Sequence, residues 1–395
     1  MTDGNRRPAC IAVLGSTGSV GRQTLETAEF LGIRVETLSG CRNIGRLEEQ
    51  IRRFRPRYCA VAAEKAGRDL KTRVRDTGTK ILSGREGVVE AARIGEAEIV
   101  CNSIMGTAGL FPTLAAIEAG RHVALSNKET IVTAGEYVMR RAHTYGVRIL
   151  PVDSEHSAIF QCLRAGRPEQ VRRLLLTCSG GPFYGRKRTD LAAVTPEEAL
   201  AHPTWKMGPK ITVDCGTLMN KGLELIEAVH LFGVSPDQVE VLIHRESIVH
   251  SLVEFEDRAV VAQLSVPDMR LCIQYALTYP ERSPSLLEPL DLTRISRLTF
   301  AQPDTEAFPL LKLAREAALA GGVMPAVLNG ANEAAVSLFL AGKITFTEIS
   351  DAVCEVVRAW RQDTCDTPLS GILEADRAAR GRIFTLCGEA AESCQ

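Results

Sequence analysis

Short apolar segments that alternate with helical segments constrain the fold of the first 150 residues most strongly. The apolar segments lie near residues 11–14, 34–38, 58–62, 98–104, 121–125 and 147–152, and a further one ends at residue 82. Strands that are separated by helices pair in parallel, and the helices then cover the two faces of the sheet. The pattern therefore predicts an α/β fold with a doubly wound domain over residues 1–152.

A glycine-rich turn follows the first apolar segment. Gly15, Gly18 and Gly21 are spaced G-x-x-G-x-x-G, and a helix is expected from about Arg22 to Phe30. Glycines allow a tight turn and close approach of the backbone to a pyrophosphate, and N–H groups at a helix start point at negative charge. Although the spacing differs from the usual G-x-G-x-x-G, its place between a strand and a helix predicts a Rossmann-like dinucleotide site.

The end of the second strand favours NADPH over NADH. Residues 39–43 read SGCRN and contain no acidic residue. An NAD site usually places Asp or Glu here for the ribose hydroxyls, whereas an arginine can pair with a 2′-phosphate. We therefore expect Gly40, Arg42 and Asn43 to lie at the cofactor site. The alternative for Arg42 is a solvated turn residue.

Polar residues also follow the strand expected over Arg121–Leu125. Asn127, Lys128 and Glu129 come directly after Ser126. Ligands in open α/β sheets bind beyond the carboxyl ends of the strands, so these three side chains are placed to contact a ligand. The start of a surface helix is the alternative for Lys128 and Glu129.

Two carboxylates follow the last strand of this domain. Asp153 and Glu155 are separated by Ser154 and come after an apolar strand over Val147–Val152. Residues i and i+2 at a strand end point to the same side, so we expect both carboxylates to face one point. Mg²⁺ and Mn²⁺ prefer oxygen ligands and leave room for substrate oxygens and water. The alternative is an acidic N-cap of the next helix.

The pattern changes after about residue 157. A helix over Ser157–Ala165 and four strands, mostly linked by hairpins, predict an antiparallel sheet with flanking helices. These strands are expected at residues 171–178, 239–243, 248–255 and 259–266. Prolines near 287–303 indicate a linker, and four helical segments from Phe308 onward indicate a helical bundle. The predicted division is an α+β domain over 153–286, a linker over 287–306 and the bundle over 307–395.

A second polar cluster lies in residues 212–224, which we expect to form a strand, a turn and a helix. Asn220, Lys221 and Glu224 then share one helical face by i, i+3 and i, i+4 spacing. A helix start that carries Asn and Lys suits a phosphate monoester. Glu224 is a candidate third oxygen ligand for a cation held by the two earlier carboxylates. The alternative is an ordinary Lys–Glu surface pair.

A loop with two prolines and a glycine lies between these clusters, at residues 199–209. It contains His202, Trp205, Met207 and Gly208. An exposed indole has an energetic cost unless it covers a ligand, so we expect a lid. Packing of Trp205 and Met207 into the nearest core is the alternative.

Composition narrows the class of protein. The 395 residues include 47 basic and 48 acidic side chains, and no apolar run approaches membrane-span length. Nucleic acid and membrane are therefore not the expected partners. The 12 cysteines contain no C-x-x-C pair, and the N-terminus lacks the apolar core of a signal peptide. Reduced thiols in the cytoplasm are expected.

Eight segments, in order, resemble the 1-deoxy-D-xylulose 5-phosphate reductoisomerase family over essentially the whole chain. They are GSTGSVG at 15–21, SNKE at 126–129, VDSEHSAIFQCL at 152–163, SGGPF at 179–183, HPTWKMG at 202–208, MNKGLE at 219–224, VPDMR at 266–270 and PAVLNGANEAAV at 325–336. The resemblance implies a Rossmann-like NADPH domain, a central α+β catalytic domain and a C-terminal helical bundle. It further implies a homodimer that uses Mg²⁺ or Mn²⁺ to isomerise and reduce a phosphorylated ketose to 2-C-methyl-D-erythritol 4-phosphate, for isoprenoid synthesis.

The resemblance also implies roles for single residues. The implied metal ligands are Asp153, Glu155 and Glu224, and the implied substrate contacts are Lys128, Ser154, Glu155, Ser179, His202, Trp205, Cys215, Asn220, Lys221 and Glu224. Catalytic roles fall to Lys128, His202 and the three metal ligands. The implied cofactor contacts are Thr17, Gly18, Ser19, Val20, Arg42, Asn43, Asn127, Glu129 and Gly208.

Some positions depart from the pattern of this family. Cys215 stands where a serine normally helps to hold the phosphate, and a thiol is a weaker donor. Pro209, the pair Arg245-Glu246 and the loop at Asp257-Arg258 also differ. Weaker phosphate binding or a somewhat different phosphorylated ketose is expected. A paralogous reductase of another phosphorylated hydroxyketone and an inactive NADPH-binding sensor remain the alternatives.

Overall fold

The protein is described by a computed structural model that covers residues 7–201, 207–361 and 367–388. The chain divides into two compact units. The first unit comprises Met1–Thr130, Glu136–Phe160 and Asp268–Pro289, and the second comprises Ile131–Gly135, Gln161–Pro267 and Leu290–Gln395. The predicted division into three segments and a linker stays a prediction.

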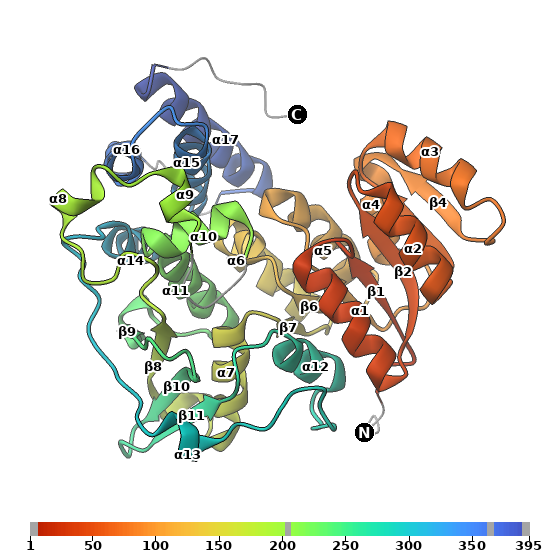
Figure 1. Ribbon diagram of the computed structural model, residues 1–395, viewed down its shortest axis with the longest axis horizontal. Helices are drawn as coiled ribbons and strands as arrows, with labels where there is room; N and C mark the ends of the chain where they lie inside the picture. Colours follow the sequence, from red (N-terminus) through yellow and green to blue (C-terminus); the bar gives the residue numbers. More distant parts are fainter. Residues whose placement is uncertain (1–6, 202–206, 362–366, 389–395) are drawn as a thin grey trace. The chain divides into compact units, whose positions relative to one another are not determined.

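A parallel sheet of seven strands forms the centre of the first unit (Figure 1). Its strands are β1 (Cys10–Leu14), β2 (Arg34–Gly40), β3 (Tyr58–Val61), β4 (Lys80–Ser83), β5 (Ile99–Asn102), β6 (His122–Leu125) and β7 (Ile149–Pro151). The spatial order is β4-β3-β2-β1-β5-β6-β7, so the chain winds outward in both directions from β1. The predicted doubly wound α/β sheet is confirmed.

Helices cover this sheet because the strands are too apolar to face water. The helices are α1 (Ser19–Leu31), α2 (Ile44–Phe54), α3 (Glu64–Arg73), α4 (Gly84–Arg93), α5 (Leu110–Glu118), α6 (Lys128–Thr144), α7 (Ser154–Cys162) and α12 (Arg270–Thr278). All five residues of β1 are buried, and apolar residues of α1, α2, α3 and α12 pack on it in one core. Segments distant in sequence therefore share the hydrophobic core beside the glycine turn.

A mixed sheet of four strands forms the centre of the second unit. Its strands are β8 (Val171–Cys178), β9 (Val239–Ile243), β10 (Val249–Phe255) and β11 (Val260–Leu264), in the order β11-β10-β8-β9. The predicted antiparallel pairing is confirmed for β10 with β8 and β11. It is wrong for β8 and β9, which pair in parallel because the long segment between them, with four helices in its described part, returns the chain to the same end of the sheet.

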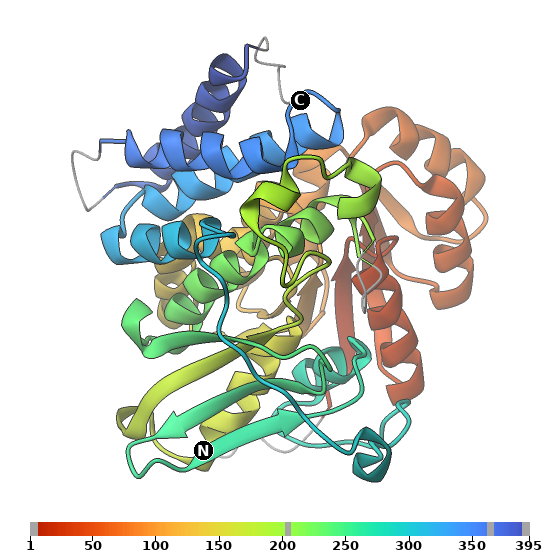
Figure 2. The ribbon, with the colours of Figure 1, turned by 60° about the vertical axis from the view of Figure 1, so that its left-hand side comes forward.

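The remaining helices of the second unit follow the chain from the middle segment to the C-terminus. They are α8 (Arg188–Leu191), α9 (Pro196–Ala199), α10 (Pro209–Gly216), α11 (Met219–Phe232), α13 (Leu292–Ile295), α14 (Leu310–Ala320), α15 (Met324–Leu340), α16 (Phe346–Arg358) and α17 (Leu369–Leu386). Short 3-10 turns occupy Gly106–Gly109, Leu163–Ala165, Pro168–Gln170 and Pro236–Gln238. The four helices α14–α17 form the predicted helical bundle (Figure 2), and α11 packs against β8, β9 and α14.

Two predicted elements differ in the structure. The strand expected at the start of residues 212–224 is wrong, because the helix α10 covers these residues. Gly208 is its N-cap, and Pro209 occupies the first turn, where the fixed φ of proline suits a helix. The helix expected from Ser157 begins earlier, at Ser154. Among the described residues, no helix is long and apolar enough to cross a membrane.

Candidate functional site

The glycine turn between β1 and α1 is built for close backbone contacts. Gly15 has a φ of +77°, and a Cβ atom on it would lie 2.9 Å from the carbonyl oxygen of Ser103. A Cβ atom on Gly21 would lie 2.3 Å from the carbonyl oxygen of Gly15. Gly18 is the N-cap of α1, and no side chain caps this end within the described residues. The first turn of α1 therefore presents backbone N–H groups to a ligand.

The predicted cofactor residues of this turn are accessible. Thr17 and Val20 are half-buried, and Gly18 and Ser19 are exposed. Val20 and Thr24 also line a small pocket, together with residues at the ends of β5 and β6. The pocket lies beyond the carboxyl ends of parallel strands, the usual position of a ligand in such sheets.

A buried hydrogen-bond network fixes the turn, and sequence reasoning missed it. The Ser16 hydroxyl donates to Gln50 Oε1 at 2.7 Å, and Gln50 Nε2 donates to the Ser16 carbonyl oxygen at 2.9 Å. The Gly15 N–H donates to the Ser39 hydroxyl at 3.1 Å. The signal for Gln50 is a polar residue on the buried face of α2. The network connects the turn, the end of β2 and α2.

The residues after β2 lie as expected. Gly40 is buried at the end of the strand, and Arg42 is exposed. Asn43 caps α2, because its Oδ1 accepts from the Arg46 N–H at 3.1 Å. An exposed arginine is compatible with a 2′-phosphate contact and with a solvated turn, so the role of Arg42 stays a prediction.

Residues 127–129 begin α6, and two of them are buried. Asn127 caps this helix through the Thr130 N–H at 2.7 Å, and its Nδ2 donates to the carbonyl oxygens of Ile104 and Gly106. Lys128 is only 7% exposed, whereas Glu129 is half-buried. A surface helix start is therefore wrong for Lys128, although the helix itself is present.

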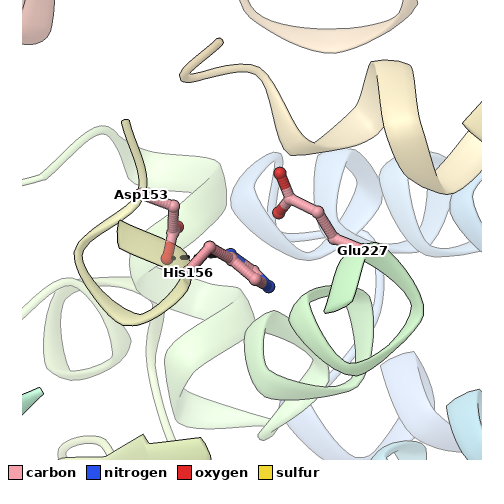
Figure 3. A group of neighbouring side chains, drawn as sticks. All are labelled: Asp153, His156 and Glu227. Carbon is pink, nitrogen blue, oxygen red and sulfur yellow. Dashed lines mark ion pairs between the residues drawn. The ribbon is translucent and has the colours of Figure 1, made fainter. Parts of the chain in front are cut away.

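The carboxylate of Asp153 has several polar and charged neighbours. Lys128 Nζ lies 3.1 Å from Oδ2 of Asp153. His156 Nδ1 lies 3.2 Å from Oδ1 of the same carboxylate, and Figure 3 shows these two side chains. A carboxylate oxygen of Asp153 and one of Glu155 lie within 4.8 Å of each other. The Ser154 hydroxyl donates to the Glu155 carboxylate. The two carboxylates are therefore close enough to share one cation.

The strand-end geometry expected for these carboxylates is wrong, although they do lie close together. Ser154 and Glu155 stand in the first turn of α7, not on an extended strand. The Glu155 N–H donates to Asp153 Oδ1 at 3.2 Å, which is the bond of an N-cap. The capping alternative is thus correct for Asp153. It does not exclude a ligand role, because a carboxylate can accept several bonds.

The polar cluster of the second unit lies on α11 and is buried. Asn220 Nδ2 donates to Glu224 Oε1 at 2.5 Å, and Lys221 Nζ pairs with the other carboxylate oxygen. Lys221 and Glu224 are each 2% exposed, so the surface-pair alternative is wrong. The three residues share one helical face, as the spacing predicted.

Two further buried polar residues were not singled out from the sequence. His156 follows Asp153 by three positions in α7, and Glu227 follows Glu224 by three positions in α11. Both are almost fully buried, and both are drawn in Figure 3. Their i+3 spacing from a predicted ligand is the sequence signal that could have identified them.

The predicted phosphate residues outside α11 lie in two packed loops of the second unit. Ser179 follows β8, and its Oγ accepts from the Gly181 N–H at 3.3 Å. A Cβ atom on Gly181 would lie 2.4 Å from the carbonyl oxygen of Cys215, so this loop lies against the end of α10. His202 and Trp205 lie outside the described residues. Met207 is half-buried, and Gly208 is exposed at the N-cap of α10.

Three family models match successive segments of the chain. The family model described as 1-deoxy-D-xylulose 5-phosphate reductoisomerase matches residues 11–135. The model of the C-terminal domain of the same enzyme matches residues 149–232. The model described as the DXP reductoisomerase C-terminal domain matches residues 264–382.

Related proteins match over nearly the whole chain. A 1-deoxy-D-xylulose 5-phosphate reductoisomerase of Symbiobacterium thermophilum is 53% identical over 377 residues, which cover 94% of this chain and 96% of the relative. The solved structure from Zymomonas mobilis in complex with NADPH has a TM-score of 0.91 and 40% identity, and covers 98% of this chain and all of that chain. A structure of DOX-P reductoisomerase in complex with NADPH, fosmidomycin and magnesium has a TM-score of 0.89 and 39% identity, and covers 96% of this chain and 98% of that chain. The protein belongs to the 1-deoxy-D-xylulose 5-phosphate reductoisomerase family.

Proposed function

We propose that this protein isomerises 1-deoxy-D-xylulose 5-phosphate and reduces the product with NADPH, giving 2-C-methyl-D-erythritol 4-phosphate, with Mg²⁺ or Mn²⁺ as its metal. Support comes from relatives named for this activity and from their complexes with NADPH and magnesium. The observation that carries the proposal is the buried Lys221–Glu224 pair on α11, at the family motif MNKGLE. Burying a charged pair costs desolvation free energy, and such buried charged groups are concentrated at functional sites.

The proposed metal ligands are Asp153, Glu155 and Glu224. Their donor atoms are all carboxylate oxygens, which fit Mg²⁺ and Mn²⁺ better than softer metals. The close pair of Asp153 and Glu155 oxygens supports this assignment, because two adjacent carboxylates repel without a cation. A bound divalent cation supplies Lewis-acid polarisation for neighbouring hydroxyl and carbonyl oxygens.

Lys128 is the proposed proton-handling residue. Its Nζ is buried and lies beside Asp153, so it is held in one place and can donate a hydrogen bond to a substrate oxygen. Ser154 and Glu155 would orient the substrate backbone next to it. His156 is a proposed positioning residue for Asp153, because its Nδ1 lies 3.2 Å from Asp153 Oδ1.

The phosphate of the substrate is proposed to bind at Ser179, Asn220 and Lys221. Lys221 contributes a positive charge, and the hydroxyl and amide contribute donors, which together suit a phosphate monoester. Cys215 would lie beside them as a weak donor. His202, Trp205 and Met207 would cover the bound substrate and keep water away from the hydride transfer.

The cofactor is proposed to bind at the glycine turn of the first unit. Backbone N–H groups of Thr17, Gly18, Ser19 and Val20 would contact the pyrophosphate. Arg42, with Gly40 and Asn43 beside it, would select the 2′-phosphate of NADPH. Asn127, Glu129 and Gly208 are the further proposed contacts.

A homodimer and a cytoplasmic location complete the proposal. The edge strand β11 leaves Val260 49% exposed, and an exposed edge strand is a natural pairing surface. Light scattering after size-exclusion chromatography should give twice the 42.9 kDa chain mass, and a monomeric mass contradicts the dimer.

The cysteines that the structure describes are all free thiols, which suits a reducing compartment. Recovery in a periplasmic or extracellular fraction of cells would contradict that location.

The proposed function is tested by NADPH oxidation with 1-deoxy-D-xylulose 5-phosphate, with and without Mg²⁺ or Mn²⁺. We expect oxidation that requires the metal, with 2-C-methyl-D-erythritol 4-phosphate identified by mass spectrometry. Faster turnover of a different phosphorylated ketose would instead identify a paralogous reductase. NADPH binding without turnover of any of these substrates would indicate the sensor.

A further inference from the structure

We infer that Arg245 is a positioning residue for the substrate phosphate, because it fixes the loop Ser179–Gly181 that follows β8. The inference rests on the proposed function, in which Ser179 binds the phosphate. In the sequence, Arg245 is only a departure from the family pattern. In the structure, its side chain binds the loop that carries Ser179.

The loop Ser179–Gly181 cannot hold its own conformation. Gly180 and Gly181 have φ values of +79° and +69°, so two consecutive residues adopt the left-handed region. Glycine adopts positive and negative φ values about equally well, so it does not by itself fix the backbone in this region. Within the loop, the Gly181 N–H donates to Ser179 Oγ at 3.3 Å, which is long for a hydrogen bond. The loop therefore depends on its neighbours for a fixed shape.

Arg245 holds the loop from one side. Its Nη1 donates to the carbonyl oxygens of Ser179 at 3.0 Å and Gly181 at 3.1 Å. The guanidinium also lies 5.1 Å from the ring centroid of Tyr184, which stacks against it. On another side, Gly181 lies against the carbonyl oxygen of Cys215. One arginine thus bridges the carbonyl oxygens of Ser179 and Gly181, the residues on either side of Gly180.

The bridge has a consequence for the Gly180 N–H. A trans peptide places its C=O and N–H on opposite sides. Since the Ser179 carbonyl oxygen faces Arg245, the N–H of Gly180 points away from the guanidinium. Gly180 is buried, and its N–H has no hydrogen-bond partner among the described residues. Buried N–H groups are nearly always paired, so this donor is available for a ligand such as phosphate.

Arg245 therefore acts through the loop. With Arg245 present, the Gly180 N–H and the Ser179 hydroxyl form a prearranged pair of donors. Such preorganisation lowers the cost of ordering a loop on binding. It is useful in this chain because the neighbouring Cys215 thiol is a weak donor.

The test compares Arg245→Met and Arg245→Lys with the control Arg186→Met in the full-length protein. Arg186 is also an exposed arginine stacked on an aromatic ring, that of Phe183, but no described hydrogen bond joins it to residues 179–181. The readouts are kcat, the KM for 1-deoxy-D-xylulose 5-phosphate, the KM for NADPH and the Kd for inorganic phosphate by calorimetry.

For Arg245→Met we expect the substrate KM and the phosphate Kd to rise together by about tenfold, the effect of one lost charge-assisted hydrogen bond. The kcat and the KM for NADPH should stay within about twofold of the wild type, and Arg245→Lys should recover part of the loss. Unchanged phosphate Kd in Arg245→Met, or an equal effect of Arg186→Met, overturns the inference. So does a joint loss of kcat and NADPH binding, which would show general unfolding.

The two proposals can fail separately. If the wild type does not oxidise NADPH with this substrate, the proposed function fails. The phosphate Kd of Arg245→Met against wild type still decides the role of Arg245, because it needs no turnover.

Discussion

Cys215 makes a single-residue prediction about phosphate binding. A thiol donates a much weaker hydrogen bond than a hydroxyl, and Cys215 lies at the end of α10 against the loop Ser179–Gly181. Cys215→Ser should therefore lower the KM for 1-deoxy-D-xylulose 5-phosphate by about threefold to tenfold, with kcat nearly unchanged. Steady-state kinetics at saturating NADPH measures this. An unchanged or higher KM would show that residue 215 does not limit phosphate binding.

His250 makes a prediction about stability and pH. Burial, helped by the nearby charges of His244 and Lys221, lowers the pKa of the His250 imidazole to about 4. In the unfolded chain the imidazole binds a proton below about pH 6.5, whereas in the folded chain it stays neutral until about pH 4. Protonation therefore favours the unfolded state as the pH falls from 6.5 to 4, and stability is lost in that window.

Urea unfolding at pH 7 and pH 5 measures this effect. From pH 7 to pH 5, the free energy of unfolding of the wild type should fall by about 2 kcal/mol more than that of His250→Asn. The reason is that one titrating imidazole changes this free energy by at most about 1.4 kcal/mol per pH unit. His143→Asn is the control, since His143 is exposed on α6. Equal losses in the wild type and His250→Asn would contradict the assignment.

At the scale of elements, α15 is connected to α10 through a buried carboxylate. Asn332 Nδ2 donates to Asp214 Oδ1 at 2.8 Å, and Lys210 Nζ lies 2.9 Å from Asp214 Oδ2. Asp214 is buried, so the loss of a donor leaves part of its charge unsatisfied. Asn332→Ala should reduce the free energy of unfolding by about 2 kcal/mol. It should also raise the substrate KM, because α10 carries Cys215.

Chemical denaturation and steady-state kinetics test this connection. The control is Ser337→Ala on the same helix, because the Ser337 hydroxyl donates within α15, to the Ala334 carbonyl oxygen. The control should change stability by less than about 0.5 kcal/mol, the usual size for a site without such a network. If Asn332→Ala and Ser337→Ala have the same small effect on both quantities, the bond between Asn332 and Asp214 contributes neither to stability nor to substrate binding.

The elements differ in how far the sequence could predict them. The β1–turn–α1 unit was predictable, because the apolar run, the glycines and the helical periodicity all indicate the same structure. The C-terminal half of α10 was not. Thr212 and Val213 favour a strand locally, but Pro209 starts a helix and the buried helical packing prevails.

Contacts between distant segments explain the other failures. The parallel pairing of β8 and β9 depends on the path of the segment between them, which contains α8 to α11, and local sequence does not encode it. The bond between Ser16 and Gln50 joins residues 34 positions apart. The burial of Lys221 and Glu224 likewise depends on the packing of α11 against other elements. The candidate residues were therefore found by motif, whereas their hydrogen-bond partners required the structure.

At the scale of the whole molecule, the proposed cation site takes its ligands from two distant parts of the chain. Asp153 and Glu155 follow β7, and Glu224 lies in α11. A cation that binds all three carboxylates would make metal affinity depend on both of these segments. This dependence is the central claim, and it can be measured without turnover.

The most direct test is the binding of Mn²⁺, followed by electron paramagnetic resonance, to the wild type, Asp153→Asn, Glu155→Gln and Glu224→Gln. We predict one Mn²⁺ per chain in the wild type and at least about a tenfold higher Kd in each variant, because each loses one charged oxygen ligand. Binding by Glu224→Gln with the wild-type Kd would show that α11 supplies no ligand, and would contradict the account.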